Sequence, residues 1–220
     1  MRRIMSIAAH PDDEMLGCGG TLALFTEKGN LVKSVILGEG MLSRKDPQTT
    51  LSSLQNDARN ANRALGIHNV VFYELPDNAF DTVSLLSIVQ ILEKEILLFK
   101  PDIVFTHYGN DLNIDHRRTF EAVMTACRSQ PGFINPDIYS FFIPSSTDWI
   151  DGVAFPPFSP NFYVDISTTI ERKLSALSKY ETEMKEYPHS RSIEALRVFS
   201  KYWGAVSVGS MPISSSSYGA

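Results

Sequence analysis

Residues 3–25 read RIMSIAAHPDDEMLGCGGTLALF, in which a short apolar run gives way to a polar turn and then to apolar residues at helical spacing. The run from Arg3 to Ala9 is typical of a buried strand. The spacing after the turn continues until Lys28-Gly29-Asn30, where glycine is typical of a helix end; it is carried by Leu16, Leu22, Ala23 and Phe25. The segment therefore predicts a strand, a loop and a helix, in that order.

The same unit recurs along the chain. Further apolar runs predict strands at residues 31–37, 70–73, 103–106, 138–142 and 162–164. Apolar residues at helical spacing predict helices at residues 51–65, 83–99, 119–127, 168–184 and 192–203. Strands that alternate with helices form a parallel sheet covered on both faces. The sequence thus predicts an α/β fold: a single domain over residues 1–220, Rossmann-like and three-layered, with a mostly parallel sheet and a polar, partly frayed tail at 206–220.

Composition and charge narrow the class of protein. The 220 residues carry 20 Lys and Arg against 25 Asp and Glu, so the chain lacks the basic surface that nucleic-acid binding requires. The most apolar helix, residues 83–99, is interrupted by charges, and no uncharged stretch approaches the ~18 residues of a membrane span. Two cysteines are too few for a disulfide framework. We expect a cytoplasmic protein with reduced thiols that acts on a small molecule.

The first cluster of reactive residues is His10-Pro11-Asp12-Asp13-Glu14, at the carboxyl end of the first predicted strand. Ligands bind at that edge of an open parallel sheet. His nitrogen and Asp oxygen both ligate zinc at ~2.0–2.2 Å, and their spacing on this turn lets His10 and Asp13 point at one cation. Asp12 would point in a different direction, close enough to reach a metal-bound water without being a ligand.

The second cluster, His107 to Arg117, follows the fourth predicted strand and so reaches the same edge. His116 begins a helical run that would fix its ring, and we take it as the third ligand. Ligands of the type His, Asp, His leave a position open for water, as catalytic zinc sites do, and they also suit ferrous iron. Either cluster alone is more typical of a solvated turn or a helix N-terminus. Their coincidence at one edge favours a metal site.

The glycines in Gly17-Cys18-Gly19-Gly20 suggest an alternative, a dinucleotide-binding loop. That fingerprint requires G-x-G-x-x-G directly after the strand, whereas here the polar segment 10–14 intervenes and the third glycine is displaced. We expect these glycines to allow close packing of the helix on the sheet.

These motifs together resemble a known family. Ala9-His10-Pro11-Asp12-Asp13-Glu14, continuing through Leu16-Gly17-Cys18-Gly19-Gly20 to Ala23, resembles the N-terminal signature of the LmbE-like (PIG-L type) deacetylases, zinc-dependent enzymes that remove N-acetyl groups from sugars. The resemblance extends from the first strand to about Gly204 through segments 37–40 with Arg44, 110–117, 164–167 with Lys173, and 187–192.

The resemblance implies that His10, Asp13 and His116 hold zinc and that Asp12 is the general base. One position departs from the pattern: many members have His-Pro-Asp-His, whose first histidine helps to polarise the substrate carbonyl, and here that position is Asn113. The role of stabilising the oxyanion therefore falls to the zinc together with Asn113, His189 or His107.

The leading hypothesis is a metal-dependent hydrolase that removes an N-acetyl group from a sugar, sugar nucleotide or sugar conjugate. Zinc lowers the pKa of water to about 7, and Asp12 takes its proton and later passes a proton to the leaving nitrogen. Asp12, His189 and Asn113 are the candidate catalytic residues, Asp115 is expected to orient a ligand, and three residues are assigned to substrate binding: Arg44, Asp111 and His107.

Two other functions stay open at this point. The chain could hydrolyse another small N-acyl amide, because the metal motifs specify amide chemistry rather than the acyl acceptor. It could also be a sugar- or nucleotide-binding module with a structural ion and no turnover, in which case Asp12→Asn should leave function intact. Whether the chain forms a homo-oligomer is left open as well.

Overall fold

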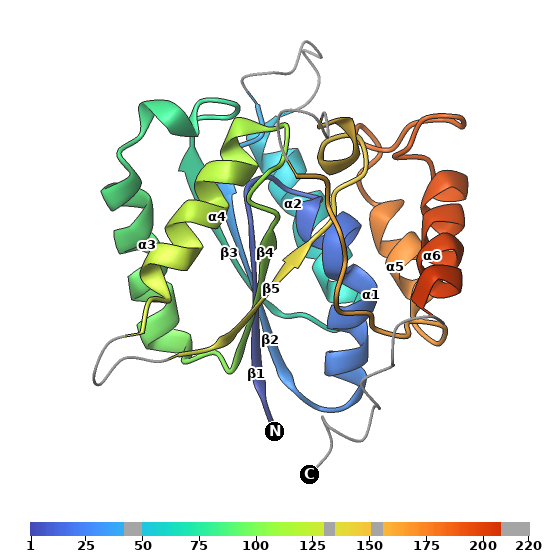
Figure 1. Ribbon diagram of the computed structural model, residues 1–220, viewed down its shortest axis with the longest axis horizontal. Helices are drawn as coiled ribbons and strands as arrows, with labels where there is room; N and C mark the ends of the chain where they lie inside the picture. Colours follow the sequence, from blue (N-terminus) through green and yellow to red (C-terminus); the bar gives the residue numbers. More distant parts are fainter. Residues whose placement is uncertain (42–49, 130–134, 151–155, 208–220) are drawn as a thin grey trace.

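The computed structural model describes residues 1–41, 50–129, 135–150 and 156–207 (Figure 1). Its centre is a five-stranded parallel sheet in the order β3-β2-β1-β4-β5. The strands are β1 (Arg3–Ala8), β2 (Leu31–Gly38), β3 (Asn69–Leu75), β4 (Ile103–His107) and β5 (Asp137–Phe141). Ile4 of β1 pairs with Val32 of β2 on one side and with Ile103 of β4 on the other. Strands β2 and β3 thus extend the sheet on one side of β1, and β4 and β5 then extend it on the other side.

Helices cover both faces of the sheet, which confirms the predicted three-layer α/β fold (Figure 1). One face carries α3 (Leu85–Phe99) and α4 (Ile114–Ala126), and the other carries α1 (Asp13–Glu27), α2 (Leu51–Ala64), α5 (Ile170–Leu177) and α6 (Ile193–Ser207). Two short 3₁₀ helices are η1 (Phe80–Thr82) and η2 (Thr147–Trp149). Alternate residues of β1 face opposite layers: Ile4 joins the core on the α1 side, whereas Met5 and Ile7 join the core on the α3 side.

The glycines after the first polar turn allow α1 to pack closely, as expected. A Cβ at Gly17 would lie 2.3 Å from the ring of Phe141, and one at Gly20 would lie 2.7 Å from Ile166 Cδ1. Both distances are shorter than any normal carbon contact. The glycines therefore serve packing against β5 and the segment before α5.

Some predicted boundaries were wrong. Residues 162–164 form no strand, and the ring of Phe162 packs on that of Tyr139 of β5. The helix predicted at 168–184 ends at Leu177, since the chain then turns to bury Tyr180 completely. The helix predicted at 119–127 starts at Ile114, five residues earlier. Among the described residues, no helix is long and apolar enough to cross a membrane.

Candidate metal centre and catalytic site

The candidate site lies where the strand order reverses. β1 and β4 are neighbours in the sheet, but the chain leaves their carboxyl ends toward helices on opposite faces, which opens a crevice there. The turn after β1 carries residues 10–14, and the loop after β4 leads to the start of α4. The two polar clusters of the sequence therefore meet in space.

The three predicted ligands come together. The donor atoms of His10, Asp13 and His116 all lie within 4.8 Å of one another. Asp13 Oδ2 is 3.3 Å from His10 Nδ1 and 3.3 Å from His116 Nε2, and Asp13 Oδ1 is buried with no hydrogen-bond partner in the described part of the chain. Two imidazoles that converge on a buried carboxylate with a free oxygen form a donor set that fits a divalent cation such as Zn²⁺.

Each of these histidines has a second carboxylate at its other nitrogen. His10 Nε2 donates to Asp115 Oδ2 at 2.9 Å, and His116 Nδ1 lies 3.1 Å from Asp111 Oδ1. Although burial lowers the pKa of His10, the carboxylates of Asp115 and Asp13 raise it to about 10. Carboxylates placed in this way orient metal-ligating histidines and raise their basicity. A cation bound at Nδ1 of His10 would replace a proton there.

The two outer carboxylates are themselves fixed by the backbone and by hydroxyl groups. Asp115 accepts the backbone N–H groups of Asn78 at 2.6 Å and Phe80 at 2.9 Å. Asp111 accepts hydrogen bonds from the hydroxyls of Ser146 and Thr147. Burial raises the pKa of Asp111, but the hydrogen bonds from His116 and these hydroxyls lower it to about 2. Both carboxylates are thus held rigidly behind the histidines.

A further carboxylate was missed by the sequence analysis. Asp77 Oδ1 lies 3.3 Å from His10 Nε2, and His10, Asp77 and Asp115 form a second group of donors within 4.8 Å. Because Asp115 already accepts two backbone N–H groups, the first donor set is better placed to hold a cation. The signal for Asp77 was present in the sequence, since Pro76-Asp77-Asn78 directly follows the carboxyl end of β3.

Asp12 is buried beside the donor triad but contacts a different partner. Its Oδ2 accepts a hydrogen bond from Arg191 Nη1 at 3.1 Å, and Arg191 Nε donates to Ser145 Oγ at 2.7 Å. Burial raises the pKa of Asp12 well above its usual range, and the Arg191 guanidinium opposes this shift. Arg191 belongs to segment 187–192 of the family resemblance, which assigns no role to this residue.

The three candidates for stabilising the oxyanion are placed very differently. Asn113 caps α4: its Oδ1 accepts the N–H of Asp115 at 2.8 Å, and its Nδ2 donates to Asn78 Oδ1 at 3.1 Å. His107 is fully buried, and its Nε2 accepts the N–H of Ala9 at 2.8 Å. His189 is half-buried, and its Nδ1 accepts the backbone N–H of Arg191 at 3.0 Å, which leaves Nε2 as the ring's donor.

Two of the three residues assigned to substrate binding are enclosed behind His116. Asp111 and His107 are both completely buried, and the ring of His107 stacks on that of His116 at 4.0 Å. Burial also lowers the pKa of His107 well below its ordinary value, so the ring stays neutral. These placements favour a role for both residues in holding His116. Arg44, the third candidate, lies outside the described residues.

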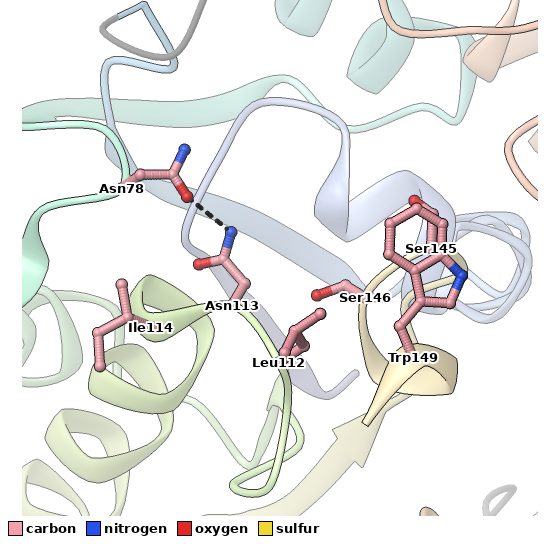
Figure 2. A pocket seen from close by; sticks show the side chains of 7 residues that line it. All are labelled: Asn78, Leu112, Asn113, Ile114, Ser145, Ser146 and Trp149. Atoms are coloured by element: carbon pink, nitrogen blue, oxygen red, sulfur yellow. Dashed lines mark hydrogen bonds between the residues drawn. The ribbon is translucent and has the colours of Figure 1, made fainter. Parts of the chain in front are cut away.

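An open pocket of about 380 Å³ adjoins the site (Figure 2). Figure 2 shows the hydrogen-bonded amides of Asn78 and Asn113 at one side and Trp149 at the other. The indole of Trp149 is exposed, at 59%, and Leu112 between them is also exposed. The remaining lining residues are Ile114, Ser145 and Ser146. The pocket thus combines amides and hydroxyls with one large aromatic face.

Together these features define an α/β protein with a candidate divalent-metal centre at the switch point of its sheet. The chain belongs to the PIG-L family: the family model described as GlcNAc-PI de-N-acetylase matches residues 5–127, more than half of the chain. The resemblance stated from the motifs is therefore confirmed.

Individual relatives agree with this placement. The chain is 28% identical to the diacetylchitobiose deacetylase of Thermococcus kodakarensis over an alignment that covers 94% of this chain and 79% of that protein. Among solved structures, it superposes on the conserved protein TT1542 of Thermus thermophilus with a TM-score of 0.75 at 22% identity, covering 94% and 90% of the two chains. It also superposes on GalB, the 4-carboxy-2-hydroxymuconate hydratase of Pseudomonas putida, with a TM-score of 0.72 at 18% identity and 96% and 91% coverage. The two structural likenesses show the fold.

Proposed function

We propose that this protein is a zinc-dependent N-deacetylase that removes the acetyl group from an N-acetylated sugar or sugar conjugate. The observation that carries the proposal is the arrangement of His10, Asp13 and His116 around one point. Buried Asp12 lies beside them and is hydrogen-bonded to Arg191 instead. Membership in a family described by de-N-acetylation and the identity to a diacetylchitobiose deacetylase support the same chemistry.

In this proposal, His10 Nδ1, Asp13 and His116 Nε2 hold the ion, and ferrous iron is the alternative that the same donors accept. When bound, the ion supplies the Lewis acidity that hydrolysis of an unreactive amide needs. Asp115 and Asp111 keep the two imidazoles in the orientation and tautomer that ligation requires. The chain therefore supplies both the ligands and their supports.

Asp12 acts as the general base. It takes a proton from the attacking water and returns one to the departing amine nitrogen. His189 is the proposed donor to the substrate's acetyl oxygen, because Nδ1 is engaged with the backbone of Arg191 and Nε2 bears the proton. Asn113 is less suited to that role, since its amide is held by the cap of α4 and by Asn78, which leaves a single N–H on Nδ2.

We assign the sugar to the pocket of Figure 2. The exposed face of Trp149 offers a flat apolar surface for a sugar ring, and the amides and hydroxyls around it can bond ring hydroxyl groups. Arg44 remains a proposed contact to a hydroxyl or phosphate of the substrate. The cytoplasm remains the proposed compartment, which the two buried free thiols, Cys18 and Cys127, support.

The fold alone does not select this reaction, since a hydratase shares it. The test therefore identifies the product. Purified protein is analysed for metal content and for release of free amine from N-acetylglucosamine and N,N'-diacetylchitobiose. Wild-type protein is compared with Asp12→Asn and with a matched control at an exposed aspartate in η1, Asp81→Asn.

Wild-type protein and Asp81→Asn should hold about one metal per chain and release amine. Asp12→Asn should keep the metal and lose about 10²–10⁴ in rate, the usual contribution of a general base. Loss of metal from Asp12→Asn would mean that this residue is a ligand, and full activity would mean that the chain has another base. A wild-type protein that binds no metal after reconstitution, or that releases no amine, would overturn the proposal.

A further inference from the structure

Arg191 joins three segments that are far apart in the sequence. It precedes α6, whereas Asp12 follows β1 and Ser145 follows β5. Its Nη1 donates to Asp12 Oδ2 at 3.1 Å and its Nε donates to Ser145 Oγ at 2.7 Å. The side chain of Asp12 is 4% exposed and that of Arg191 is 20% exposed, so this pair is largely removed from water.

Surface ion pairs of the same chain are different. Arg172 pairs with Glu27 and Arg197 pairs with Glu171, and in both cases the carboxylate is exposed. Such pairs contribute little to stability or geometry. In a buried pair, by contrast, loss of one partner leaves an uncompensated charge. Arg191 is thus coupled to its carboxylate in a way that Arg197 is not.

Arg191 Nη1 also lies 3.9 Å from Glu183 Oε2, but the backbone is unusual at the two residues that accept hydrogen bonds from the Arg191 side chain. Asp12 has a φ of 106° and Ser145 a φ of 67°, and neither is glycine. Residues other than glycine keep such conformations only where their surroundings impose them, and they cluster at functional sites. Two residues with such backbone conformations are hydrogen-bonded to one guanidinium, which is typical of a functional site.

Asp12 also gives up the usual role of an aspartate at its position. It is the N-cap residue of α1, where an aspartate side chain normally accepts an N–H from the first helical turn. Here the side chain makes no capping hydrogen bond. Its carboxylate is bound to Arg191 instead.

We propose that Arg191 is a positioning residue that holds the Asp12 carboxylate in its working orientation through the bridge to Ser145. This inference rests on the proposed function, in which Asp12 is the general base. The planar guanidinium holds its donors in a fixed fork, so Nε on Ser145 fixes the direction of Nη1 toward Asp12. A lysine at this position has a single charged nitrogen and does not reproduce the bridge.

The test is a double-mutant cycle between Asp12→Asn and Arg191→Met, with Arg197→Met as the matched control on an exposed pair. Each protein is measured for kcat, KM, metal content and thermal unfolding. Arg191→Met should keep the metal and show kcat lowered by about 10², the cost of a small misplacement of a reacting group, with KM changed by less than about 3-fold. Arg197→Met should behave as wild type.

The cycle separates this role from its alternatives. Because Arg191 acts through Asp12, adding Arg191→Met to Asp12→Asn should lower kcat by less than about 3-fold further. Losses that multiply would mean that Arg191 contacts the substrate directly, and would overturn the inference. Inactive Asp12→Asn together with fully active Arg191→Met would overturn it while leaving the proposed function intact. Active Asp12→Asn would remove the proposed base itself.

Two further measurements keep the inference testable if Arg191→Met folds poorly or the substrate is not found. Ser145→Ala removes the acceptor for Nε but leaves the charge pair, and should lower kcat by about 10-fold with unchanged thermal unfolding. A crystal structure of Arg191→Lys or Arg191→Met should show the Asp12 carboxylate displaced from the position in which Arg191 and Ser145 hold it, with Asp13 in place. An unmoved Asp12 carboxylate would contradict the inference.

Discussion

Two groups of buried charge lie on different parts of the sheet, and they are built on different principles. The first joins Lys33 of β2, Glu95 of α3 and Tyr73 of β3. Lys33 Nζ donates to one carboxylate oxygen of Glu95, and Tyr73 donates to the other at 2.5 Å. The second is the donor group around Asp13, in which Asp13 Oδ1 and His107 Nδ1 are buried without a hydrogen-bond partner among the described residues.

The difference separates a structural cluster from a site. Buried polar atoms are nearly always paired, and one that is not calls for an explanation such as an ion. In the Lys33 cluster both carboxylate oxygens of Glu95 have donors, so a further ligand has nothing to satisfy. Around Asp13, carboxylate oxygen and imidazole nitrogens converge with an oxygen to spare. Completeness of pairing therefore distinguishes the two groups better than charge or burial does.

The largest expected effect comes from a substitution in the donor group around Asp13. Asp13→Ala removes the carboxylate that both His10 and His116 face, so only two imidazoles remain where three ligands are needed. Metal content should fall from about one per chain to the level of a chelated sample, and amine release should fall to background. Asp165→Ala, at an exposed aspartate, is the control. Retention of metal by Asp13→Ala would place the ion elsewhere.

A substitution in the Lys33 cluster should lower the free energy of unfolding without affecting metal binding. Lys33→Met leaves the carboxylate of Glu95 buried without its cation, which typically costs about 3–5 kcal/mol in the free energy of unfolding. Urea unfolding measures this loss. The double variant Lys33→Met/Glu95→Leu should recover most of it, because an apolar pair of similar size often replaces a buried ion pair without penalty. Loss of metal from folded Lys33→Met would show that the two groups are not independent.

Asp111→Asn tests whether this carboxylate supports the metal or binds substrate. It accepts from two hydroxyls and lies 3.1 Å from His116 Nδ1, so the variant should weaken metal affinity by about 10–100-fold, as the loss of an orienting carboxylate does. Competition with a chelator of known affinity measures the change. An unchanged metal affinity with a raised KM would restore the substrate-binding role predicted from the sequence.

The fold was largely predictable from the sequence because its signals are local. Apolar runs, helix ends and the polar turn at residues 10–14 locate all five strands and the edge at which His10, Asp13 and His116 meet. The burial of a polar residue, in contrast, depends on segments that are distant in the sequence. The sequence assigns His107 and Asp111 to substrate binding, and only the packing of α4 and the segment 143–147 shows that both are enclosed.

Arg191 shows the other limit. It meets Asp12 across 179 positions of sequence, after a proline-rich region whose path has no periodic pattern. A charged residue in a motif near the C-terminus therefore gives no indication of which strand edge it reaches. Asp77 differs, since a rule that marks every polar turn after a strand would have found it.

A smaller effect concerns acid. Burial raises the pKa of Glu95, but the hydrogen bonds from Lys33 and Tyr73 outweigh it, so the pKa lies below its ordinary value. Glu95 therefore stabilises the fold above the unfolded pKa of about 4.3, and this contribution is lost as the pH falls through the lower, folded value. The wild-type free energy of unfolding should fall between about pH 5 and pH 3 more steeply than that of Glu95→Gln. Parallel curves would contradict a closed pair.

The smallest effect is expected at Trp149, in the pocket that adjoins the donor group around Asp13. If a sugar ring packs on the exposed indole of Trp149, Trp149→Ala removes a contact of about 1 kcal/mol, which corresponds to about a 5-fold rise in KM. The value of kcat should change less than KM, because Trp149 lines the pocket and meets the proposed donor His189 only ring edge to ring, at 6.5 Å between centroids. Tyr202→Ala, which removes a similarly exposed ring on α6, controls for general loss of aromatic surface.

A rise in KM with N,N'-diacetylchitobiose but not with N-acetylglucosamine would place the second sugar, and not the reacting one, on Trp149. An unchanged KM with both would move the sugar away from this pocket while leaving the metal chemistry untouched.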